Sequence, residues 1–266
     1  MIKMKKISLV LAMLSVGLYV DAQNITLDNY YNQEVRKTTN GQVENYHYLW
    51  TDKEMSGFSI LGETFLNNGA KELTTLSKAP NKKNLKNTDV YIIVDPDHLA
   101  DNPKPNYMDE KSAASIAKWV KSGGVLLLMG NDKANADLEH FNILTSKFGF
   151  RFTDDVILGV KDDNHFDDGG LSTSGVSLFK TSKRIFIKYA ASIAIESPAV
   201  SVLQTTDGKN AIVSANYGKG AVLAVGDPWL YNEYTNGRLP ARFENDKAAA
   251  DVVQWLMSHS NKKRFR

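Results

Sequence analysis

The residues best placed for chemistry lie in one polar loop, residues 226–238. This loop gathers aromatic, acidic, amide and basic side chains, namely Trp229, Tyr231, Asn232, Glu233, Tyr234 and Arg238. It follows the apolar run 221–225, which is typical of a strand buried on both faces. Open α/β sheets build binding sites from loops at the carboxyl ends of their strands. The sequence therefore predicts a site here without naming a reaction. The alternative is a tight loop held in place by its own aromatic side chains.

Two further apolar runs end in polar clusters. Asp95-Pro96-Asp97-His98 follows one run, and Asn131-Asp132 follows the run 125–129. The carboxyl ends of parallel strands meet at one edge of a sheet, so parallel neighbours would bring all three clusters together. Each cluster alone is a weak signal, because an acid just past a strand, such as Asp95 or Asp227, often caps a turn.

Three histidines differ in their surroundings. His140 comes early in the helix predicted after Asn131-Asp132 and would lie near the same edge, although a structural histidine is an equally good interpretation. His47 is flanked by aromatic residues, including Trp50. His165 lies in an acidic loop and is expected to be solvent-exposed.

The remaining pattern predicts the elements that would position these groups. Helices are indicated over about 56–67 (with Ser56 as N-cap), 109–122, 135–148 and 245–258, and strands over 73–76, 89–94, 125–129, 185–187, 192–195, 200–205, 211–215 and 221–225. Strands that alternate with helices at short spacing favour parallel, right-handed crossovers. We therefore predict an α/β fold, a mostly parallel sheet flanked by helices with a β-rich second half.

The first 22 residues resemble an export signal. A basic start precedes the apolar stretch 7–20, and Val20-Asp21-Ala22 fits a small-residue cleavage site. We expect a signal peptide over 1–22 and a single domain over 23–266, periplasmic or secreted and without membrane insertion after cleavage. The sequence holds no cysteine, which excludes disulfides, thiolate metal sites and a cysteine nucleophile. A formal net charge of +2 gives no reason to expect nucleic acid as a partner.

Motifs of several enzyme classes are absent. The chain has no GxGxxG, no GxxxxGK[ST], no GxSxG and no HExxH, so we expect no cofactor and no metal. Residues 95–98 offer three potential ligands in a row, but adjacent residues rarely all point at one ion. The acidic loop 162–170 offers several carboxylates that suit calcium, but they do not have the spacing of an EF-hand.

Four segments, residues 47–80, 89–108, 119–150 and 226–256, resemble one known domain. It is the glutamine-amidotransferase-like domain that follows the catalytic barrel in exported unsaturated glucuronyl and rhamnogalacturonyl hydrolases. The loop GDPWLYNEYTNGR is the most specific part of the match. A standalone chain of this type is also similar to the oligosaccharide dehydratases of ulvan degradation. Amidotransferase activity does not carry over, because its triad needs a cysteine.

The resemblance implies a hydro-lyase that removes water from a non-reducing-end uronic acid and leaves a 4,5-unsaturated sugar. The partner would be an anionic, uronate-containing and possibly sulfated oligosaccharide. Arg238 would bind the carboxylate, His47 and His140 are candidates for base or acid, and Tyr231 is a candidate phenolic donor. Sugar contacts are expected from Trp50, Asp97, Asn131, Asp132, Trp229, Glu233 and Tyr234, and Tyr234 is also a second candidate donor.

Two other functions stay open. The same cleft would serve a non-catalytic module that binds carbohydrate or docks a partner hydrolase. A structural accessory protein would use its loop aromatics for packing alone. Two histidines near the expected cleft favour chemistry, because sugar binding seldom needs a base.

Overall fold

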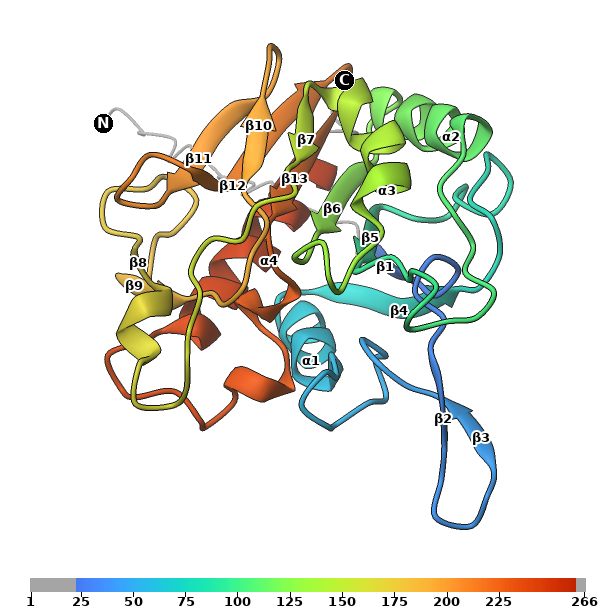
Figure 1. Cartoon of the computed structure of the whole chain (residues 1–266). Coiled ribbons are helices and arrows are strands. Elements are labelled where there is room, and N and C mark those ends of the chain that lie inside the picture. Colours follow the sequence, from blue (N-terminus) through green and yellow to red (C-terminus); the bar gives the residue numbers. More distant parts are fainter. Residues whose placement is uncertain (1–22, 262–266) are drawn as a thin grey trace, which may run out of the picture.

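The computed structural model describes residues 23–261, with the backbone alone for Trp229, Glu233 and Asn261. The predicted signal peptide lies outside the described residues. One seven-stranded sheet forms the centre, in the order β11-β12-β13-β6-β5-β1-β4 (Figure 1). Its parallel strands are β1 (Gln23–Asp28), β4 (Ala70–Leu76), β5 (Val90–Val94), β6 (Val125–Met129) and β13 (Gly220–Val225). The predicted α/β fold is thus confirmed.

Two antiparallel strands complete one side of the sheet. β12 (Asn210–Tyr217) pairs with β13, and β11 (Val200–Gln204) pairs with β12. Three small two-stranded antiparallel sheets lie outside the central sheet: β2 (Val35–Lys37) with β3 (Val43–Asn45), β7 (Phe150–Phe152) with β10 (Ile193–Ile195), and β8 (Gly170–Ser172) with β9 (Arg184–Phe186). Short 3-10 turns cover Ser146–Phe148, Phe166–Gly169, Pro228–Leu230 and Glu233–Thr235.

Helices cover both faces of the sheet, and the alternation of strand side chains explains why. In β5, Val90, Ile92 and Val94 contribute to one core cluster, while Tyr91 and Ile93 contribute to a second cluster on the opposite face. The first cluster lies under α1 (Ser59–Asn67) and α4 (Asn245–Asn261), and the second under α2 (Glu110–Lys121) and α3 (Leu138–Thr145). All five residues of β5 are therefore buried.

The start of one helix agrees with the sequence pattern, and the starts of two others differ from it. Asp109 caps α2 as its side chain accepts a hydrogen bond from the Ser112 backbone N–H at 2.7 Å. The N-cap of α1 is Phe58, which makes no side-chain capping bond, so the expectation that Ser56 caps this helix is wrong. α3 begins only at Leu138, where Asp137 is the cap, and residues 135–137 precede it.

The three strands that end in the polar clusters are neighbours in the sheet, as a shared site requires. β5 pairs with β6 and β6 pairs with β13, with Val90 and Ala221 both in register with Val125. The loops that follow these three strands therefore leave the same edge of the sheet. Gly226 marks the exit of β13, because a Cβ there would lie 2.1 Å from the carbonyl oxygen of Ala191. Only glycine allows the backbone to pass this close.

Candidate functional site

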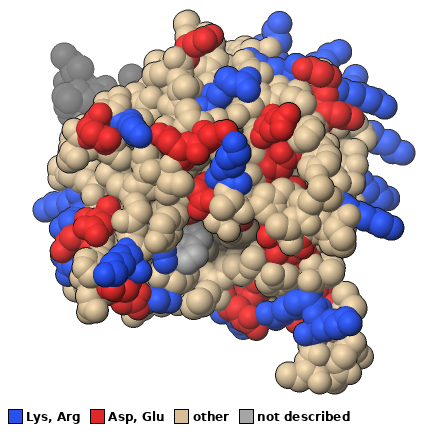
Figure 2. Space-filling model, viewed as in Figure 1, with Lys and Arg blue, Asp and Glu red and all other residues tan. Residues whose placement is uncertain are grey.

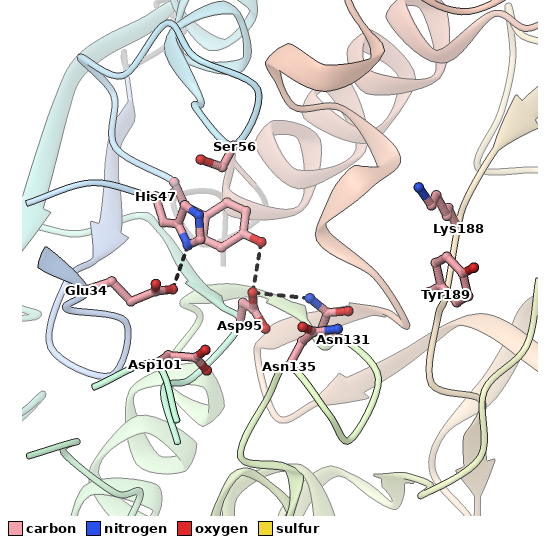
Figure 3. A pocket seen from close by; sticks show the side chains of 10 residues that line it. Glu34, His47, Ser56, Asp95, Asp101, Asn131, Asn135, Lys188 and Tyr189 are labelled. Carbon is pink, nitrogen blue, oxygen red and sulfur yellow. Dashed lines mark hydrogen bonds and ion pairs between the residues drawn. The ribbon is translucent and has the colours of Figure 1, made fainter. Parts of the chain in front are cut away.

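A cavity of about 270 Å³ opens at the carboxyl edge of the parallel strands. The loops after β1, β5 and β6 meet there with the segment that follows β3 and with residues 188–189. Its lining consists of Glu34, His47, Tyr48, Ser56, Asp95, Asp101, Asn131, Asn135, Lys188 and Tyr189. Figure 3 shows Glu34, His47 and Asp95 on one side of the cavity and Lys188 and Tyr189 on the other.

Backbone strain is concentrated in this lining. Five non-glycine residues among those described have a positive φ, and His47, Tyr48, Asp95 and Tyr189 are four of them. A left-handed backbone costs a non-glycine residue free energy and persists only where its surroundings enforce it. Such residues cluster at functional sites. The strain therefore marks this cavity as the candidate site independently of any motif.

A histidine–carboxylate pair forms one wall. His47 Nδ1 lies 2.6 Å from Glu34 Oε1, and the Tyr46 hydroxyl donates to Glu34 Oε2 at 2.9 Å. A carboxylate beside Nδ1 fixes the ring orientation and holds a proton on that nitrogen. The opposite nitrogen, Nε2, is then the one that can accept a proton, as in catalytic histidine–carboxylate pairs.

A buried carboxyl group lies beside this pair. Asp95 Oδ2 accepts a hydrogen bond from the Tyr48 hydroxyl at 2.8 Å and from Asn131 Nδ2 at 3.2 Å. Burial raises the pKa of Asp95 well above its ordinary value, and burial beside Asp95 also raises the pKa of Tyr48. Tyr48 therefore keeps its proton and acts as a donor to Asp95.

Lys188 supplies positive charge on the far wall. Its backbone N–H donates to Asp227 Oδ2 at 2.8 Å, which ties residue 188 to the loop after β13. Its ammonium lies 5.4 Å from the ring centroids of Tyr189 and Tyr234. Lys188 is thus positioned by two aromatic faces at the edge of the cavity.

Of the predicted site residues, His47 and Asn131 line the cavity. Asp132 follows directly, but its carboxylate is used within its own turn, where it accepts from the Ala134 N–H and from Asn135 Nδ2, each at 2.8 Å. Asp97 is buried behind the lining. Its Oδ2 accepts from the Gln33 N–H at 2.9 Å and from Asn102 Nδ2 at 2.8 Å. Asp97 thereby connects the loop after β1 to the loop after β5.

Other predicted residues lie outside this lining. His140 Nδ1 contacts Asp137 Oδ2 at 2.8 Å, and its ring stacks on Tyr107 at 4.3 Å. The Trp50 indole donates to the Thr74 carbonyl at 3.0 Å, and its ring packs beside Phe58 and Phe65. Both side chains thus have structural partners of their own.

The loop 226–238 lies next to the cavity rather than inside it. Arg238 Nη2 donates to both oxygens of Asp163 at 2.9 Å, and the guanidinium lies 4.0 Å from the Tyr234 ring centroid. Tyr231 is buried and lines a separate hollow of about 190 Å³. The side chains of Trp229 and Glu233 lie outside the described part of the structure.

Several lining residues were not predicted as site residues, namely Glu34, Tyr48, Ser56, Asp101, Asn135, Lys188 and Tyr189. Most of them come from segments without regular structure, where sequence periodicity carries no information. Asp95 was expected at this edge as part of the polar cluster 95–98, but a turn cap was an alternative and no site role was assigned to it. Two signals were available: the aromatic run around His47 placed a histidine and tyrosines together, and the polar cluster 95–98 placed Asp95 at the end of a strand.

Two kinds of site find no support in residues 23–261. The described side chains include no group of three or more His, Cys, Asp or Glu that could hold a metal ion. Over the same residues, every helix is too short or too polar to cross a membrane.

Asp97 leads to a prediction on stability. Burial raises the pKa of Asp97 to about 6 and does the same for Asp28. The folded protein therefore keeps protons that the unfolded chain releases above pH ~4, so the free energy of unfolding falls as pH rises from ~4 to ~6. In Asp97→Asn the free energy of unfolding should fall less steeply with pH, by at most about 1.4 kcal/mol per pH unit.

Denaturant titrations at several pH values measure this slope. The control is Asp162→Asn, because Asp162 is exposed and His165 lowers its pKa, so the fall between pH ~4 and ~6 should remain. An Asp97→Asn protein with the wild-type slope would contradict the assignment.

No protein-family model matches the chain, and no curated protein matches it. Among solved structures, it is similar to the mmIFT52 N-terminal domain, with 19% identity over 88% of this chain and 97% of that chain and a TM-score of 0.61. It is also similar to cytoplasmic protein STM1381 from Salmonella typhimurium LT2, with 13% identity over 77% of this chain and 87% of that chain and a TM-score of 0.50.

A third match covers part of a much longer protein. The chain aligns with Gan42B, a GH42 β-galactosidase, at 17% identity and a TM-score of 0.49, over 89% of this chain but 30% of that chain. At these identities the similarities show the fold alone. That fold is similar to class I glutamine amidotransferase-like domains.

Proposed function

We propose that the protein is an exported dehydratase that removes water from the non-reducing-end uronic acid of ulvan-type oligosaccharides. The observation that carries this proposal is the pairing of His47 with Glu34 on one side of a cavity that has Lys188 on the other (Figure 3). A proton acceptor and a cation are the two groups that such an elimination needs first. The resemblance seen in the sequence supplies the substrate class.

The chemistry assigns a role to each wall. The C5 proton of a uronate is weakly acidic, and it becomes easier to remove when the neighbouring carboxylate is neutralised by a cation. Lys188 is the cation in the lining, and His47 Nε2 is the base. Glu34 and Asp101 line the cavity as well and repel a carboxylate, so the sugar acid points toward Lys188. The hydroxyl groups of the bound sugar then face Asp95, Asn131 and Asn135.

The loop 226–238 extends this arrangement. Arg238 and Lys188 both contact the Tyr234 ring, at 4.0 and 5.4 Å, so a second cation lies one aromatic ring away from the cavity. Arg238 is therefore placed to bind the anionic sugar that follows the reacting one in the oligosaccharide, and not the reacting sugar itself. On the face drawn in Figure 2, acidic side chains are scattered over the middle and basic ones project mainly from the rim. Such a face gives no reason to expect nucleic acid as the partner.

The test is a turnover assay on purified protein. The substrate is an ulvan oligosaccharide with a saturated uronic acid at its non-reducing end. We expect ultraviolet absorbance from the conjugated 4,5-double bond to rise, and mass spectrometry to show the loss of one water with no chain cleavage. A carbohydrate-binding module would bind the same oligosaccharide with no change in absorbance, which would refute the proposal.

A further inference from the structure

Asp95 occupies a sharp bend directly after β5. Its φ of 45° is left-handed, its backbone N–H donates to the Met129 carbonyl at 2.9 Å, and its own carbonyl accepts from Asn32 Nδ2 at 2.7 Å. Both backbone groups are thereby fixed, and the strained bend turns the side chain into the cavity (Figure 3). A turn cap would not need a buried side chain, yet Asp95 is only 6% exposed.

The two carboxyl oxygens of Asp95 have different surroundings. Oδ2 accepts from the Tyr48 hydroxyl and from Asn131 Nδ2. The Asn131 amide is oriented for donation, because its Oδ1 accepts the Asp132 N–H at 2.8 Å. Within residues 23–261, Asp95 Oδ1 is buried and has no hydrogen-bond partner. A proton on Asp95 therefore belongs on Oδ1, the oxygen left for a ligand.

The charges around Asp95 favour its protonated form. Burial is the main reason that its pKa is raised, and the carboxylates of Glu34 and Asp101 raise the pKa further. The neutral donors Tyr48 and Asn131 only partly offset these effects. The lining also contains one positively charged group, Lys188, and one ionisable group, His47. The same logic keeps carboxylic acids neutral in other enzymes so that they can donate a proton.

From this geometry we infer that Asp95 is the proton donor to the departing 4-hydroxyl group, with Tyr48 and Asn131 as its positioning residues. The inference rests on the proposed dehydratase function. His47 Nε2 takes the proton from C5, and the C5–H electron pair forms the C4=C5 double bond. The C4–O bond breaks as Asp95 Oδ1 gives its proton to the leaving oxygen, which departs as water. The proton on His47 then returns to Asp95 through solvent, so the cycle balances.

A change of leaving group tests the donor role. Fluoride departs without a proton, so a 4-deoxy-4-fluoro uronate at the non-reducing end needs the base but not the acid. Asp95→Asn should lower the rate on the natural 4-hydroxyl substrate by about two to four orders of magnitude. It should keep most of the wild-type rate on the fluoro substrate. His47→Ala is the comparison variant and should lose activity on both substrates.

Equal losses on the two substrates, or full activity of Asp95→Asn on the natural one, would overturn the donor role while leaving the dehydratase intact. A wild-type protein that eliminates neither water nor fluoride would instead refute the proposed function itself. Infrared difference spectra between wild type and Asp95→Asn at neutral pH add a measurement independent of turnover. The carbonyl band of a protonated carboxyl group should disappear in the variant; its absence from the wild type would also overturn the inference.

The positioning residues have their own signature. Tyr48→Phe removes one hydrogen-bond donor to Oδ2, so the carboxylate form of Asp95 is less stabilised and the pKa of Asp95 rises further. The pH at which the rate begins to fall, because Asp95 loses its proton, should therefore be higher in the variant than in the wild type. A purely structural role for Tyr48 would lower the rate at every pH by the same factor. Circular dichroism of Tyr48→Phe and Asp95→Asn checks that both variants are folded.

Discussion

Replacing His47 with alanine is expected to lower the elimination rate by about two to four orders of magnitude, because the reaction loses its base. Glu34→Gln should have a smaller effect, since the imidazole remains but loses the carboxylate that orients it and fixes its protonated nitrogen. The loss should appear mainly in kcat, as a group that acts in the transition state contributes little to ground-state binding. Initial rates from ultraviolet absorbance measure both variants.

His140 provides a matched control for this experiment. It too is paired with a carboxylate, that of Asp137, but it stacks on Tyr107 and is not among the residues that line the cavity. His140→Ala should therefore keep the wild-type rate. If His47→Ala also keeps it, the proton-transfer assignment is wrong even though the activity is real, and the tyrosines of the loop 226–238 become the candidates.

Lys188→Ala is the second substitution with a large expected effect. Removing the cation leaves the substrate carboxylate without its partner as negative charge develops at C5, and we expect kcat to fall by about two to three orders of magnitude. Lys188→Arg keeps the charge and should recover part of the rate. Arg238→Ala should raise KM more than it lowers kcat, because Arg238 is bound to Asp163 beside the cavity.

A larger loss of kcat in Arg238→Ala than in Lys188→Ala would contradict the roles given to these two residues. If Arg238→Ala loses more in kcat than Lys188→Ala does, then the uronate carboxylate binds at the loop 226–238, as the resemblance seen in the sequence implied. Titration with a saturated uronate measures binding in each variant and separates weak affinity from slow chemistry.

The middle of the central sheet was predictable because three of its strands are apolar runs. β5, β6 and β13 are buried on both faces, and uninterrupted runs of Val, Ile and Leu admit few other interpretations. β1 was missed, although it lies between β5 and β4. It carries Thr26 and Asp28, whose burial is compensated by hydrogen bonds. The Thr26 hydroxyl bonds with the hydroxyls of Thr74 and Thr88, and the Tyr91 hydroxyl donates to Asp28. Only the tertiary structure supplies those partners.

The sequence predicted at which edge of the sheet the site lies, but not most of the residues that line it. Parallel strands placed Asn131 at the cavity, and the aromatic segment placed His47 there. Glu34 and Lys188 come from irregular segments whose positions depend on long-range contacts, such as the bond from the Lys188 N–H to Asp227. The left-handed backbone at His47, Tyr48 and Asp95 also leaves no mark in the sequence, because none of these residues is glycine.

Transfer of the C5 proton is the central claim, and a substrate deuterated at C5 tests it most directly. The account predicts that the wild-type protein converts this substrate more slowly than the unlabelled one. Mass spectrometry should show that the 4,5-unsaturated product contains no deuterium, since the C5 deuteron has passed to His47 and from there to solvent. A product that retains deuterium, or no product at all from a folded protein, would contradict the account.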